Sequence, residues 1–134
     1  MYKIQGLLAV EMFLTNDNKI LVNEVAPRPH NSAHYSIEAC TNSQFDQHIK
    51  SILDLPLGCS KSNIFAIMVN LVGEKGFSGP ARYNGIKEAM EFDNVSVHLY
   101  GKTETKPNRK MGHATILDTS LKNCLLYTSP SPRD

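Results

Sequence analysis

The chain opens with two short stretches in which apolar and polar residues alternate, separated by a polar turn. The stretches run from Ile4 to Thr15 and from Lys19 to Ala26, and the letters NDNK lie where they meet. Alternation with a period of two, broken by Asn and Asp, predicts an antiparallel hairpin. Strict alternation places Glu11 and Glu24 on neighbouring strands at the same end, and Asn23 on the opposite face of its strand from Glu24.

The next pattern has the period of a helix. Residues Ser43 to Leu55 carry an apolar stripe at helical spacing, with Ser43 as the N-cap and Pro56 just after the end. Between the hairpin and this helix, the prolines predict a loop over Pro27 to Ser32, and His34 to Cys40 could form a short helix.

Strand patterns return in the second half of the chain. Strands are predicted over Ile64 to Val72, Val95 to Gly101 and Gly112 to Leu117, with a short helix over Ile86 to Phe92. A polar loop over Lys102 to Lys110 connects the last two strands. The fold class predicted from these elements is α+β with largely antiparallel pairing.

The sequence at both ends leads us to expect that the chain is a piece of a longer protein. A strand pattern begins almost at once, and the closing letters CLLYTSPSPRD are rich in Ser and Pro without periodicity. We expect residues 122–134 to be a disordered or foreign tail, with a division between two larger segments near residues 57 and 58.

Composition excludes several classes of function. The formal net charge of the 134 residues is +1, so nothing in bulk charge favours nucleic acid or membrane binding. The apolar run IFAIMVNLV is too short to span a bilayer. Three widely spaced cysteines fit neither a disulfide framework nor a zinc site, which favours a cytoplasmic location.

The paired carboxylates of Glu11 and Glu24 form the first candidate site. Two acids on neighbouring strands repel each other unless a cation lies between them, and Asn23 adds another oxygen. Hard oxygen ligands suit Mg²⁺. The alternative is two solvated acids on an exposed sheet.

The second candidate lies in the proline-rich loop. Arg28 stands between two prolines, so its planar fork can be held ready for an oxyanion, and His30 and Asn31 offer directional hydrogen bonds. Carboxylate, bicarbonate or phosphate would suit this set. A loop that satisfies its own backbone is the alternative, and a zinc site from His30, His34 and Glu24 is a further one.

The third candidate is the cationic loop before the last strand. Its ends should be brought together by two strands, so that its cations converge on one phosphate monoester. A solvated basic tip is the alternative. The basic side chains are Lys102, Lys106, Arg109, Lys110 and His113.

Together these segments resemble one family. The motifs NEVAPRPHNSAHY and KPNRKMGHATIL, with MVNLVGE between them, are similar to the C-terminal half of 5-(carboxyamino)imidazole ribonucleotide synthase, an ATP-grasp ligase of purine biosynthesis. The resemblance implies an antiparallel hairpin and helix from the end of an ATP-grasp lobe over residues 1–57. It implies a small β-rich C-terminal domain over residues 58–121.

The resemblance also implies a reaction and a role for each residue. ATP phosphorylates bicarbonate, and aminoimidazole ribonucleotide captures the carbon dioxide that carboxyphosphate releases. The implied roles are Mg²⁺ or Mn²⁺ on Glu11 and Glu24, nucleotide beside Asn23 and Glu24, bicarbonate or carboxyphosphate at Arg28, His30 and Asn31, and ribonucleotide phosphate at Lys102 and Arg109.

Some alternatives stay open at this stage. A formate-using ATP-grasp transformylase would share the fold and metal site, and a non-catalytic module could retain the phosphate pocket. Because the family's N-terminal lobe and ATP lid have no counterpart in these residues, we expect the chain alone to be inactive. The parent protein is expected to be a homodimer, as is usual in the family.

Overall fold

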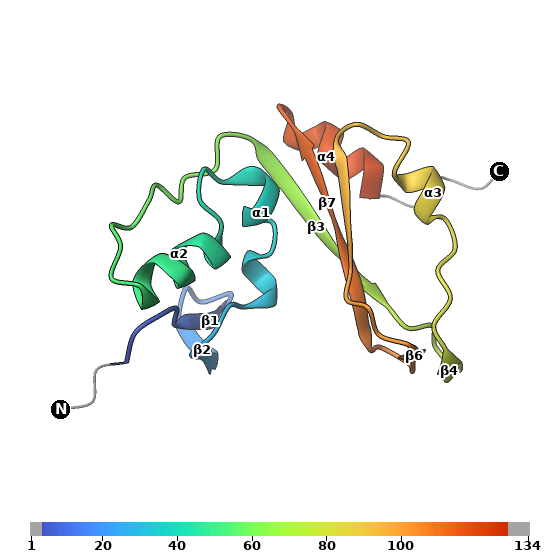
Figure 1. Cartoon of the computed structure of the whole chain (residues 1–134), viewed down its shortest axis with the longest axis horizontal. Coiled ribbons are helices and arrows are strands. Elements are labelled where there is room, and N and C mark those ends of the chain that lie inside the picture. The colour runs from blue at the N-terminus through green and yellow to red at the C-terminus, as the bar shows by residue number, and fades with distance from the viewer. Residues whose placement is uncertain (1–3, 129–134) are drawn as a thin grey trace. The chain divides into compact units, whose positions relative to one another are not determined.

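The computed structural model describes residues 4–128, with side chains to residue 125. The chain divides into two compact units, Met1–Asn63 and Ile64–Asp134, which are described separately (Figure 1). The segment after residue 57 returns to the first unit, since Asn42 N donates to Cys59 O at 3.1 Å and Cys40 forms a bridge with Ser62. The boundary between the two units falls after Asn63.

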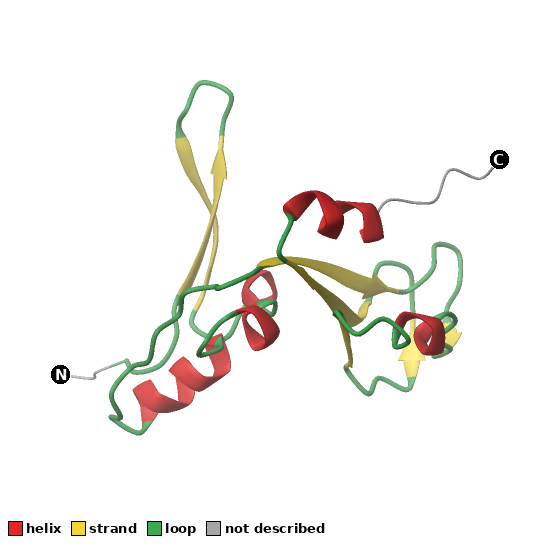
Figure 2. Ribbon diagram, turned by 90° about the horizontal axis from the view of Figure 1, so that it is seen from above, coloured by secondary structure: helices red, strands yellow, loops and turns green. Residues whose placement is uncertain are grey.

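The first unit contains the predicted hairpin. Strand β1 (Ala9–Leu14) pairs antiparallel with β2 (Ile20–Ala26), and Thr15 N donates to Lys19 O across the turn at 2.9 Å. Figure 2 shows these strands as a ribbon that extends away from the helices of the unit. Large apolar side chains of both strands are accordingly exposed, including Met12 and Val22.

Strand β1 begins later than the alternation predicted. Gly6 has a φ of 117°, in the region that favours glycine, and its N–H donates to Ser51 Oγ at 3.1 Å. Leu7 N donates to His48 Nδ1 at 3.1 Å. The chain before Ala9 is therefore hydrogen bonded to the helix that carries Ser51 and His48 rather than to β2.

Three short helical elements follow the hairpin. They are a 3₁₀ turn (Asn31–Ala33), α1 (Ser36–Ala39) and α2 (Gln44–Ile52). The predicted N-cap is confirmed, because Ser43 Oγ accepts from Asp46 N at 3.2 Å and Asp46 Oδ2 accepts from Ser43 N at 2.8 Å. The apolar stripe of α2 is partly exposed, with Ile49 at 54%.

The second unit is built on a three-stranded antiparallel sheet. Its order is β3 (Phe65–Val72), β7 (Lys110–Asp118) and β5 (Val95–Leu99), which confirms the three predicted strands. A short pair, β4 (Gly79–Pro80) with β6 (Glu104–Thr105), was not predicted.

Two helices contact the strands of this sheet. Helix α3 (Ile86–Ala89) is shorter than predicted, and α4 (Leu121–Thr128) packs against β3 and β7. Cys124 of α4 is completely buried, and its thiol lies 3.7 Å from Phe65 O. Regular structure thus continues into the segment expected to be a tail, and residues 129–134 of that segment lie outside the described residues.

No helix among residues 4–128 has the length and apolar character needed to cross a membrane.

Candidate functional site

A β-bulge brings three polar side chains of the hairpin together. Glu11 and Glu24 are register partners, and the register shifts between Glu11 and Met12, which pairs with Val22. Asn23 is therefore the extra residue of β2. A bulge interrupts the alternation of faces, so Asn23 Nδ2 donates a short hydrogen bond to Glu11 Oε1. Strict alternation had wrongly separated Asn23 from the acid pair.

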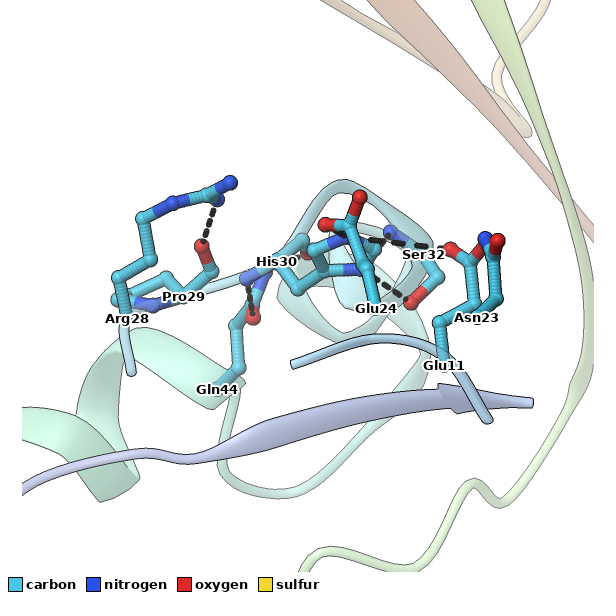
Figure 3. A network of polar contacts seen from close by, with 8 residues as sticks. All are labelled: Glu11, Asn23, Glu24, Arg28, Pro29, His30, Ser32 and Gln44. Atoms are coloured by element: carbon cyan, nitrogen blue, oxygen red, sulfur yellow. Dashed lines mark hydrogen bonds and ion pairs between the residues drawn. The ribbon is translucent and has the colours of Figure 1, made fainter. Parts of the chain in front are cut away.

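The imidazole of His30 lies beside both carboxylates. Its Nε2 is 2.9 Å from Glu24 Oε1 and 3.9 Å from Glu11 Oε2. The His30 side chain is 10% exposed, whereas those of Glu11 and Glu24 are 39% and 49% exposed. The two acids thus face solvent on one side and a buried imidazole on the other (Figure 3).

The hydrogen bonds of His30 define which ring nitrogen carries the proton in the neutral form. The side chain accepts from the backbone N–H of Ser32, whose nitrogen lies 3.4 Å from Nδ1, and Ser32 Oγ is 2.8 Å from the same ring nitrogen. Because Nδ1 acts as an acceptor, the proton is assigned to Nε2, which donates to Glu24.

The backbone of His30 is held by the first residue of α2. His30 N donates to Gln44 Oε1 at 2.8 Å, and Gln44 Nε2 donates to His30 O at 2.9 Å. Gln44 is buried, and Figure 3 shows its amide directly beneath the His30 backbone. The sequence analysis did not select this residue.

Arg28 and Asn31 border the His30 cluster without joining it. Arg28 is exposed, and its Nη1 donates to Pro29 O at 3.0 Å. Figure 3 places the guanidinium at the opposite end of the group from Glu11 and Asn23. Asn31 begins the 3₁₀ turn, and its carbonyl accepts from His34 N at 3.2 Å. The remaining donors of the Arg28 fork can bind an oxyanion.

In the second unit, basic side chains of the cationic loop donate hydrogen bonds to backbone carbonyls of the same segment. Lys102 Nζ donates to Lys110 O and lies 5.7 Å from the centre of the Tyr100 ring, while Arg109 Nη1 donates to Glu104 O at 3.1 Å. Lysine has three donors and arginine five, so both retain donors for a phosphate.

His113 does not belong with these cations. It lies in β7, is 2% exposed, and its Nδ1 is 2.9 Å from Tyr100 Oη. Its ring stacks on His98 with centroids 4.6 Å apart. The expectation that His113 contributes to the loop was wrong, because β7 begins at Lys110 and takes His113 into the core.

Comparisons with known proteins agree for both units. Residues 2–45 match the ATP-grasp domain, and residues 66–125 match the phosphoribosylaminoimidazole carboxylase C-terminal domain. The crystal structure of N5-carboxyaminoimidazole ribonucleotide synthetase from Thermotoga maritima is 52% identical with a TM-score of 0.86, covering 92% of this chain and 34% of that one. The chain belongs to the N5-carboxyaminoimidazole ribonucleotide synthase family.

Other family members support the same assignment. Phosphoribosylaminoimidazole carboxylase of Candida glabrata is 46% identical over 124 residues, which are 89% of this chain and 21% of the relative. The Aspergillus clavatus synthase solved with ADP and 5-aminoimidazole ribonucleotide is 36% identical with a TM-score of 0.78, covering 93% of this chain and 33% of that one. The chain thus spans about a fifth to a third of these proteins.

The C-terminal match corrects one expectation about the N5-carboxyaminoimidazole ribonucleotide synthase resemblance. The tail beginning at residue 122 was expected to depart from the family, but the matched domain extends to residue 125. The burial of Cys124 in α4 gives the physical reason, since this helix forms part of the core of the second unit.

The hairpin of this N5-carboxyaminoimidazole ribonucleotide synthase family member has donors suited to Mg²⁺. Carboxylates in register supply hard oxygen atoms, and Mg²⁺ commonly takes one or two protein carboxylates and completes its shell with water and phosphate oxygens. Among the described residues, no group of three or more His, Cys, Asp or Glu is arranged to hold a metal.

Proposed function

We propose that this chain forms part of an ATP-dependent ligase that carboxylates 5-aminoimidazole ribonucleotide with bicarbonate in purine biosynthesis. The observation that carries the proposal is the cluster of Glu11, Asn23, Glu24 and His30 on an ATP-grasp hairpin. The proposed enzyme acts in the cytoplasm as a homodimer, as the unpaired cysteines and the family resemblance respectively suggest.

The proposed role of the hairpin is to hold the metal that accompanies ATP. Glu11 and Glu24 would ligate Mg²⁺ or Mn²⁺, with Asn23 beside the nucleotide. When bound, the metal offsets negative charge on the phosphate being transferred. Asn23 limits the rotation of the Glu11 carboxylate by its hydrogen bond, so one ligand is oriented before the metal arrives.

The proposed role of the loop after β2 is to hold bicarbonate and carboxyphosphate. Arg28 can offer two parallel N–H groups to a planar oxyanion, and His30 and Asn31 provide further polar contacts. Holding the acceptor oxygen close to the transferred phosphate lowers the barrier through orientation. The buried position of His30 favours a fixed geometry for this acceptor site.

The proposed role of the second unit is to bind the ribonucleotide phosphate. Lys102 and Arg109 would donate to its oxygens, exchanging or supplementing their present bonds to loop carbonyls. Gly73 N donates to Arg109 O at 2.9 Å, so the end of β3 supports the backbone that carries Arg109.

A chimera with the Thermotoga maritima enzyme tests this function. Residues of this chain replace the aligned segment of that enzyme, and ADP release is measured with bicarbonate or formate, with and without the ribonucleotide. We expect release that requires both bicarbonate and ribonucleotide, and none from the 134-residue chain alone, which spans 34% of the structural relative.

The result against the proposal would be a folded chimera that uses formate instead, or one that binds the ribonucleotide without releasing ADP. The first outcome would favour a transformylase and the second a phosphate-binding module. Circular dichroism of the chimera and of the unmodified enzyme provides the folding control.

A further inference from the structure

The side chain of Gln44 is a buried amide that contacts the loop at several points. It exchanges two hydrogen bonds with the backbone of His30, at 2.8 and 2.9 Å, and its Nε2 is 2.7 Å from His34 Nδ1. Gln44 is 8% exposed. The amide uses its oxygen and both N–H groups in these contacts.

These bonds fix the backbone conformation of His30 and therefore the direction in which its side chain points. His30 is extended, with φ of −120° and ψ of 146°, and Gln44 pairs with both its N–H and its carbonyl as a neighbouring strand would. The backbone N–H of Gln44 donates to Ser36 Oγ at 3.0 Å, so the start of α2 is also bonded to the first residue of α1. The start of α2 thereby determines where the imidazole lies.

We propose that Gln44 is a positioning residue for the acceptor site, which acts by holding the His30 imidazole against Glu24. The side-chain hydrogen bonds of Gln44 go to His30 and His34 rather than to Glu11 or Glu24, so its effect on the acid pair passes through His30. The catalytic consequence rests on the proposed function, whereas the positioning of the ring is a property of this chain alone.

The start of α2 provides a matched control. Ser43 and Asp46 cap the first turn of the same helix, and their capping hydrogen bonds join them to each other rather than to His30. Ser43→Ala therefore weakens the helix start without removing the bonds to His30. A merely structural role for Gln44 predicts that Ser43→Ala and Gln44→Met have the same effects.

The first test measures kinetics in the Thermotoga maritima chimera. We expect Gln44→Met to lower kcat on the order of 10²-fold, because small displacements of reacting groups cost about this much. The KM for ATP should change by less than about twofold, since nucleotide binding is not the step affected. Gln44→Glu keeps an acceptor for His30 N–H and should lie between wild type and Gln44→Met, while Ser43→Ala keeps kcat.

The second test uses the 134-residue chain and needs no activity. Correlation spectra of the imidazole nitrogens report which nitrogen carries the proton in the neutral form of His30. Wild type and Ser43→Ala should show the proton on Nε2, whereas Gln44→Met should show a mixture of both tautomers because the ring is no longer held against Glu24 and Ser32.

The results of the two tests are interpreted together. An unchanged His30 tautomer in Gln44→Met, or equal kcat losses in Gln44→Met and Ser43→Ala, would overturn the inference. If the chimera is inactive, the proposed function fails and the spectra alone decide the positioning. If Gln44→Met does not fold, Gln44→Glu takes its place in both tests, and wild-type kcat together with a wild-type tautomer would then overturn the inference.

Discussion

The sequence predicts the positions of some site residues better than those of others. Glu11 and Glu24 were expected at one end of the hairpin because the alternation and the turn determine the register. Asn23 was placed on the wrong face, since a bulge leaves no mark in an alternating pattern. Gln44 was missed because glutamine at a helix start is usually solvated, and its burial arises only from the loop folded over it.

The bidentate contact proposed between Arg28 and the oxyanion is testable by a conservative substitution. Lysine keeps the charge but not the planar fork, so Arg28→Lys in the chimera should raise the KM for bicarbonate about 10-fold, as expected for one lost charge-assisted hydrogen bond. The KM for ATP should stay the same. Arg82→Lys, on an exposed position of the second unit, is the control. An unchanged bicarbonate KM would remove Arg28 from the acceptor site.

Secondary structure was predictable where local patterns are strong. The hairpin, the capped helix α2 and the three sheet strands follow from alternation, turn residues and the Ser43 cap. The two-residue strands β4 and β6 were not predictable, because they form only where two distant loops meet. Helix α4 was missed because its stability comes from burying Cys124 against the sheet rather than from its own sequence.

The capping box of α2 should make the stability of the first unit depend on pH. The hydrogen bonds from the side chain and then the backbone of Ser43 lower the pKa of Asp46 below its ordinary value of 3.8. The stabilisation is therefore complete above pH 3.8 and is lost as pH falls through the lower pKa of the folded state. Urea unfolding between pH 6 and pH 2.5 should show a smaller acid loss in Asp46→Asn than in wild type; equal losses would show that the cap does not contribute.

Gly73, directly after β3, packs closely against the backbone of the loop that carries Arg109. A Cβ at Gly73 would lie 2.2 Å from Lys106 O, a backbone atom that cannot move alone. Gly73→Ala should destabilise the second unit by about 1–3 kcal/mol in urea unfolding. Gly76→Ala is the comparison, because no atom lies within 4 Å of its Cβ and only its φ of 86° is strained. A smaller loss in Gly73→Ala than in Gly76→Ala would contradict the close packing.

At the scale of the whole molecule, two separately organised units share the chemistry that the family resemblance implies. The hairpin with its acidic cluster lies in the first unit, and Lys102 and Arg109 lie in the second. The sequence indicated two segments through the Pro- and Gly-containing stretch from Pro56 to Asn63, and residues 59 to 63 of this stretch bond back to the first unit. Such long-range pairing is not visible in local patterns.

The metal requirement of the chimera tests the central claim most directly. ADP release is measured against Mg²⁺ concentration for wild type, for Glu24→Gln and for Asp17→Asn, which removes the same charge from the exposed turn of the same hairpin. If the hairpin carboxylates hold the metal, Glu24→Gln should raise the half-maximal Mg²⁺ concentration at least about 10-fold, while Asp17→Asn leaves it unchanged. The same Mg²⁺ dependence in all three proteins would contradict the account.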